Sequence, residues 1–237
     1  MKTLSLIPRT SSWLAAFALG LSLCRTSAAT ASFTVTPSTV SNTYSGFITL
    51  QVAGLNSGET VVVQKFIDLN TNGVIDGSDW LVQQFQLTDG QAGMVIGGIV
   101  NSNAPGDTDS TGTQITAKLN FQSGDFIQNI VGKHLYKLSS PTGRFAPVTN
   151  LFTVTNFSFG QNFSGSVFSN NTSTPVPYSV VLLFPPPRPG QGGPGGPPLA
   201  GAVANSVGSY TIQAPPGSYS LVAFKSNYLA NFAAMSR

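Results

Sequence analysis

The stretch Ile115-Thr116-Ala117-Lys118-Leu119-Asn120-Phe121 decides the fold class. Apolar and polar side chains alternate along it, and Gly46-Phe47-Ile48-Thr49-Leu50-Gln51-Val52 shows the same alternation. A period of two residues is typical of a β-strand that has one face against a core and the other in water. Outside the N-terminus, no window of eleven or more residues carries a helical stripe. The sequence therefore predicts an all-β protein.

Further short apolar runs lie on both sides of these two segments, and clusters of Asn, Asp, Gly and Pro separate them. The strands expected in the first part of the chain cover residues 33–36, 46–52, 61–67, 81–87, 94–100, 115–121, 134–138 and 151–154. About eight short strands between residues 32 and 155 predict one immunoglobulin-like β-sandwich.

A second set of expected strands covers residues 163–168, 176–184, 199–205, 209–214 and 218–225. All eight acidic residues lie between Glu59 and Asp125, and none follows. This shift in charge places a domain boundary between residues 155 and 156. Residues 185–198 hold seven Pro and five Gly among fourteen residues. We expect them to form a long, partly polyproline-like loop rather than a docking motif.

Residues 163–228 carry a pattern of turn glycines and tyrosines. Its elements are Gly165-Ser166-Val167, Pro177-Tyr178-Ser179-Val180-Val181, Gly208-Ser209-Tyr210-Thr211-Ile212, Pro216-Gly217-Ser218-Tyr219 and Tyr228. The pattern resembles the carboxypeptidase regulatory-like domain. That resemblance implies a transthyretin-like β-sandwich that acts as a spacer or interaction module without catalysis. An unrelated sandwich with tyrosines at its turns is the alternative.

Two departures from the family pattern affect this second domain, residues 156–237. The Pro/Gly-rich loop is a long insert, and the chain ends soon after Tyr228. We therefore expect an incomplete sandwich in which the strand at 218–225 lacks its neighbours and leaves an open edge.

The N-terminus has the layout of a secretory signal peptide. Lys2 and Arg9 precede an apolar run at residues 13–23, and Ala29-Thr30-Ala31 supplies the small residues of a cleavage site. Cleavage before Ser32 would make residues 1–31 a signal peptide and the remainder a secreted or cell-envelope protein without a membrane span. Lipidation at Cys24 and an uncleaved anchor are the alternatives.

The charge and the cysteine count exclude several function classes. Without residues 1–31, the chain has eight basic and eight acidic residues and no Cys, so the pI of about 9.1 belongs largely to the signal. A balanced charge gives no support to nucleic-acid binding. One His and no Cys exclude disulfides and most zinc sites.

The strongest chemical signal is the acidic loop Asp68-Leu69-Asn70-Thr71-Asn72-Gly73-Val74-Ile75-Asp76-Gly77-Ser78-Asp79. Oxygen-bearing side chains fall at positions 1, 3, 5, 9 and 12, with Gly at position 6, which is the spacing of an EF-hand-type calcium loop. Ca²⁺ takes six to eight oxygen ligands at about 2.3–2.6 Å. The expected ligands are Asp68, Asn70, Asn72, the carbonyl of Val74, Asp76 and Asp79, and Ile75 is expected to anchor the loop in the core.

This loop resembles those of dockerins and other secreted bacterial calcium loops. Its flanks, residues 61–67 and 81–87, have strand patterns. We therefore expect a calcium loop inserted in a β-hairpin instead of a helix pair, which removes the helical surface that dockerins use for a partner. The alternative is an Asx-rich turn that binds nothing. A second acidic cluster at residues 107–112 lacks the closing carboxylate and is expected to be a solvated turn.

Nothing in the sequence predicts an enzyme. His134 is the single His, and no nucleophile-elbow motif surrounds it. The sequence predicts a non-catalytic surface or secreted module that binds calcium and meets an unknown protein or polysaccharide partner. A carbohydrate- or protein-binding adhesin fragment, or an accessory region of a longer secreted enzyme, is the alternative. Exposed aromatic residues at Trp80, Tyr136 and Tyr178 would favour the adhesin.

Overall fold

The computed structural model describes residues 30–93, 106–122, 126–170, 172–188, 190, 194–228 and 232–235. The expected signal peptide up to residue 29 and the expected strand at 94–100 lie outside these residues. None of the helices in the described part has the length and apolar character needed to cross a membrane.

The chain is all-β, as its alternation predicts, and one turn of 3-10 helix, η1 (Phe126–Asn129), interrupts the strands. Three strands of the first part form one sheet and five form another, in the orders β1-β3-β6 and β2-β8-β7-β4-β5. The bounds are β1 Ser32–Thr36, β2 Thr39–Ser41, β3 Phe47–Ala53, β4 Thr60–Ile67, β5 Trp80–Thr88, β6 Gln114–Asn120, β7 Gly132–Ser139 and β8 Val148–Thr155.

These two sheets share one apolar core, because alternate residues of each strand point inward. Ile48, Leu50 and Val52 of β3 are buried with Val61 and Val63 of β4. The alternation noted in the sequence therefore identifies the core-facing side of β3 and β6 correctly. The same core includes Phe33, Ile115, Ala117, Phe85, Leu138, Phe152 and Val154.

The second part of the chain also places two sheets around a core, in the orders β11-β10-β13-β14 and β12-β9. Phe163 and Ile212 from the smaller sheet pack with Val181, Leu183 and Leu221 from the larger one. The bounds are β9 Gln161–Ser166, β10 Val180–Phe184, β11 Ala200–Val203, β12 Ser209–Ala214, β13 Tyr219–Phe224 and β14 Phe232–Met235.

The open edge expected at residues 218–225 is wrong. Strand β13 lies between β10 and β14, with Leu182 opposite Val222 and Tyr219 opposite Met235. A four-residue run holding two Ala was too weak a pattern to predict β14 as a strand. The edges of this sheet are β11 and β14.

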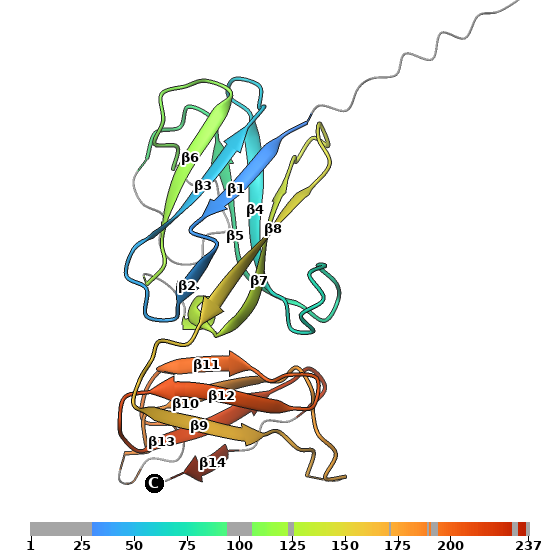
Figure 1. The fold of residues 1–237 in the computed structure, drawn as a ribbon. Coiled ribbons are helices and arrows are strands. Elements are labelled where there is room, and N and C mark those ends of the chain that lie inside the picture. Colours follow the sequence, from blue (N-terminus) through green and yellow to red (C-terminus); the bar gives the residue numbers. More distant parts are fainter. Residues whose placement is uncertain are drawn as a thin grey trace, which may run out of the picture.

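An apolar junction connects the two parts of the chain, which lie one above the other in Figure 1. Val180, Leu182 and Phe184 of β10 and Val222 of β13 pack against the lower end of the first part. The first part contributes Ile67, Leu69, Val82 and Ile130. All five residues of β10 are consequently buried, since its other face belongs to the second core.

Backbone hydrogen bonds reinforce this junction beside η1. Val131 N donates to Gly201 O at 2.8 Å, and Val203 N donates to Val131 O at 3.1 Å. A Cβ at Gly201 would lie 2.7 Å from Leu182 Cδ2 and 3.2 Å from a side-chain carbon of Ile130. Glycine therefore allows β11 to approach the first part of the chain closely.

A buried lysine occupies the first core. Lys65 Nζ lies 5.1, 5.4 and 5.5 Å from the ring centroids of Phe152, Phe121 and Tyr136. The rings offer a partly compensating cation–π contact. Burial lowers the pKa of Lys65 to about 7. Burial, with a contribution from the charge of Lys65, lowers the pKa of His134 to about 3.

These two groups predict how stability depends on pH. The unfolded chain binds more protons than the folded chain from about pH 3 to 6.5 for His134, and from about pH 7 to 10.5 for Lys65. The free energy of unfolding should therefore rise with pH through both windows, by up to about 1.4 kcal/mol per pH unit for each group. Urea titrations across the two windows measure this slope.

Lys65→Met should remove the alkaline rise and keep most of the acidic one, because burial is the larger cause of the lowered pKa of His134. Lys137→Met, on the outer face of the same sheet, is the matched control and should preserve both. Equal alkaline slopes in the wild type and Lys65→Met would contradict this assignment.

Candidate metal centre

The acidic loop joins β4 to β5, so the predicted β-hairpin setting is confirmed. The two strands pair antiparallel up to Ile67 and Trp80, which stand opposite each other on either side of the loop. Thr71 and Gly73 have φ values of 57° and 76°. Gly73 at position 6 adopts this left-handed conformation without a Cβ penalty, which allows the sharp turn that the sequence predicts.

Asp68 anchors the start of the loop. Its side chain is completely buried, and its two carboxylate oxygens accept hydrogen bonds from the backbone N–H groups of Asn72 (3.1 Å) and Gly73 (2.9 Å). The backbone N–H of Asp68 donates to Lys133 O in β7 at 3.0 Å. The first expected ligand is thus fixed to both the turn and the five-stranded sheet.

Asp76 lies at the centre of the polar contacts. Its carboxylate accepts hydrogen bonds from the side chain and backbone of Ser78, and from Nδ2 of Asn70 and of Asn72 at 2.8 Å each. These donors, with Ser78 contributing most, hold the pKa of Asp76 well below its usual range. Asp76 is therefore ionised at neutral pH and faces the residues at positions 3 and 5.

Asp79 closes the loop. Its carboxylate accepts hydrogen bonds from Leu69 N at 3.1 Å and from Asp76 N at 3.0 Å. Partial burial raises the pKa of Asp79, and the negative charges of Asp76 and Asp68 raise it further, although the two backbone donors oppose this. The three carboxylates are therefore close enough to repel one another.

One hydrogen-bond network thus includes all five side chains expected as ligands, but the two amides do not turn their oxygens toward the carboxylates. Asn70 Oδ1 accepts from Asn72 N, and Asn72 Oδ1 accepts from Val74 N. Both residues donate their Nδ2 to Asp76 instead. Within the described ranges, no group of three or more His, Cys, Asp or Glu side chains is arranged to hold a metal ion. A cation would require both carboxamides to rotate.

The apolar anchor of the loop differs from the expected one. Leu69 is buried in the junction cluster, whereas Ile75 is only half-buried. Leu69 follows the anchored Asp68, and its backbone N–H is held by Asp79. The loop is therefore attached to the junction through position 2 and not through position 8.

Two carboxylates outside the loop have structural roles that the sequence did not reveal. Asp89 accepts backbone hydrogen bonds from Gly58 (2.9 Å), Thr113 (3.1 Å) and Gln114 (3.1 Å). These donors come from two segments that are remote in sequence, so no local motif could have identified the contact. Asp89 therefore links the connection between β3 and β4, the segment after β5 and the start of β6 at one end of the first core.

Asp107 has the same role. The solvated turn expected at residues 107–112 is wrong for Asp107 itself, whereas Thr108 and residues 110–112 are exposed. It is 1% exposed, and it accepts backbone hydrogen bonds from Gly90 (3.0 Å), Asp109 (3.2 Å) and Thr116 (3.1 Å). A buried carboxylate needs hydrogen-bond donors, and these three bonds hold the segments around Gly90, Asp109 and Thr116 in place.

The remaining sequence candidates do not form a site. His134 is buried, and its Nε2 donates to Ile130 O at 2.8 Å, which fixes the ring structurally. Tyr136 is buried in the first core, and Trp80 and Tyr178 pack against the junction cluster. The three aromatic residues therefore do not form the exposed face expected for an adhesin.

Comparisons with known proteins give little further information. No family model matches the chain, and no curated protein matches it. Among solved structures, macromomycin is 16% identical with a TM-score of 0.29, over 53% of this chain and 99% of that chain.

The bonding of Asp107 predicts a large loss of stability on its removal. Asp107→Ala leaves the backbone N–H groups of Gly90, Asp109 and Thr116 without this acceptor, which should lower the free energy of unfolding by about 2–3 kcal/mol. Asp109→Ala, two residues away and partly exposed, should cost less than about 1 kcal/mol. Chemical denaturation of both variants measures the difference, and similar losses would show that Asp107 is an ordinary turn residue.

Proposed function

We propose that this protein is a secreted or cell-surface, non-catalytic module protein whose loop 68–79 binds calcium. The observation that supports this proposal best is the network in the loop, which collects the side chains at positions 1, 3, 5, 9 and 12. Three of the eight acidic residues of the chain lie in these twelve residues. Burial raises the pKa of Asp79 most, and a divalent cation would relieve the repulsion from Asp76 and Asp68 that raises it further.

Calcium would be held by Asp68, Asp76 and Asp79, by the oxygens of Asn70 and Asn72 after rotation of their carboxamides, and by the carbonyl of Val74. The ion would supply charge neutralisation and cross-linking, with no chemical step. Its stabilising effect reaches the junction through Leu69, whose backbone Asp79 holds.

We further propose that residues 32–155 form an immunoglobulin-like sandwich and residues 156–237 a transthyretin-like one of the carboxypeptidase regulatory-like type. Two observations support the first assignment: two sheets share one core, and β2 pairs parallel with the last strand of the first part, β8. The sheets around Phe163, Leu183 and Ile212 support the second. Such modules act as spacers and interaction domains, here toward a protein or polysaccharide partner.

The calcium proposal predicts a chelator-sensitive melting temperature. Extracellular calcium modules bind with a Kd of about 10⁻⁴–10⁻³ M. At roughly millimolar calcium, this contributes about 0.4–1.4 kcal/mol. The melting temperature should therefore rise by a few degrees. Magnesium should raise it less, because it prefers a tighter octahedral site. Differential scanning fluorimetry with calcium, magnesium or chelator measures the shifts.

Asp76→Asn is the most informative variant, because it removes one ligand charge and keeps a side-chain oxygen that can accept from Ser78 or from the carboxamides of Asn70 and Asn72. It should abolish the calcium shift, and so should Asp79→Asn. Asp109→Asn, outside the loop, should retain it. An identical melting temperature in calcium and in chelator would show that the loop is an Asx-rich turn.

Secretion is tested separately. We expect N-terminal sequencing of exported protein to begin at or near Ser32, because Ala29-Thr30-Ala31 fits a signal-peptidase site. Protein that begins at Met1 and stays in the cytosol would contradict the proposed compartment.

A further inference from the structure

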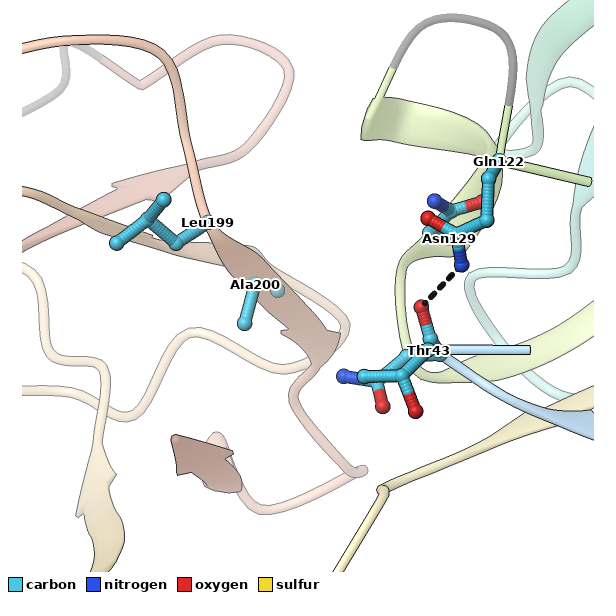
Figure 2. A pocket seen from close by; sticks show the side chains of 7 residues that line it. Thr43, Gln122, Asn129, Leu199 and Ala200 are labelled. Atoms are coloured by element: carbon cyan, nitrogen blue, oxygen red, sulfur yellow. Dashed lines mark hydrogen bonds between the residues drawn. The ribbon is translucent and has the colours of Figure 1, made fainter. Parts of the chain in front are cut away.

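A polar cavity lies at the junction of the two parts of the chain, separate from the acidic loop. Its volume is about 180 Å³. Figure 2 shows Leu199 and Ala200 on one side, and Thr43, Gln122 and Asn129 on the other. Asn42 and Gly201 complete the lining.

Both walls of the cavity are held in place by hydrogen bonds. Gln122 Nε2 donates to Asn42 O at 3.4 Å and to Tyr44 O at 2.8 Å. These bonds hold the segment after β6 against the segment between β2 and β3. Asn42 Oδ1 accepts from Phe157 N at 2.8 Å. The opposite wall is fixed by the hydrogen bonds between Val131 and β11. The cavity is therefore built before a ligand arrives.

The lining has the chemistry of a site for a neutral, hydroxyl-rich ligand. Its described lining residues bring three carboxamides and one hydroxyl, and none of them is ionisable. No described residue donates to Asn129 Oδ1, which is a buried acceptor without a partner. Since Asn129 lines the cavity, a half-turn of its carboxamide would present this oxygen to a hydroxyl group. The two side-chain hydrogen bonds that Gln122 makes with described residues both use Nε2, so among these residues its Oε1 can face a ligand.

An apolar side chain stands beside these polar groups. Leu199 lines the cavity and is 58% exposed. Ala200 and Gly201 of β11, which have a small side chain and none, leave space beside it. A sugar ring has hydroxyls around its edge and C–H groups on its faces, so it can bond to carboxamides and pack on an aliphatic residue at once. A carboxylate or an ammonium would find no charged side chain among the described lining residues, which would leave its desolvation uncompensated by them.

We propose that this cavity binds a neutral saccharide unit, with Gln122 and Asn129 as hydrogen-bonding residues and Leu199 as the apolar contact. The inference rests on the proposed non-catalytic binding role, for which it names the partner class. It does not depend on calcium. A pre-formed cavity at the boundary between two packed units is a common place for a ligand.

Binding of three neutral trisaccharides, namely cellotriose, maltotriose and chitotriose, tests the proposal on the full chain. Trigalacturonic acid is the charged comparison, and saturation-transfer NMR with calorimetry is the readout. At least one neutral sugar should bind with a Kd of about 1 mM or below. Gln122→Ala and Asn129→Ala should each weaken it about tenfold. Gln86→Ala, a carboxamide on the outer face of β5, should leave it unchanged.

Three results would overturn the proposal: no binding of any neutral sugar, tighter binding of the charged sugar, or equal losses in the cavity variants and Gln86→Ala. Gln122 is exposed, so its variant remains informative if Asn129→Ala folds poorly. Titrations in calcium and in chelator separate the two proposals. Sugar binding together with a chelator-insensitive melting temperature would remove only the calcium site, and the reverse would remove only the saccharide site.

Discussion

The double burial of β10 is the constraint on which the rest of the structure depends. Val181 and Leu183 complete the second core, while Val180, Leu182 and Phe184 point the other way, into the junction. A strand with apolar residues on both faces needs cover on both sides, because an exposed row of this kind would cost the transfer free energy of each side chain. The first part of the chain provides that cover. Truncating one such buried leucine to alanine typically costs about 2–5 kcal/mol.

Both candidate sites depend on this junction. Leu69 of the acidic loop is one of its buried members, and the polar cavity lies beside it between η1 and β11. A change in the packing of β10 would therefore reach the loop through Leu69 and the cavity through Gly201. The cavity is lined by residues of both parts of the chain, and the loop buries Leu69 in the junction between them.

The sequence predicts those features that depend on local pattern. Alternation identified β3 and β6 and their core faces, and the flanks of loop 68–79 were correctly expected to be strands. Long-range contacts are different, because periodicity shows that a face is apolar without showing what covers it. Leu69 rather than Ile75 anchors the loop, because β10 and β13 of the second part of the chain pack in the junction at position 2. Asp107 is buried because Gly90 and Thr116 bring N–H groups to it, and Lys65 is tolerated where aromatic rings surround its ammonium group.

The junction should unite the two parts of the chain into a single folding unit. Equilibrium unfolding in urea, monitored by hydrogen exchange of individual amides, tests this most directly. Amides of β4, in the first core, and of β10, in the second, should lose protection together, with one midpoint and one slope. Leu182→Ala should lower both midpoints equally. Separate transitions for β4 and β10, with only the β10 transition shifted by Leu182→Ala, would contradict the account.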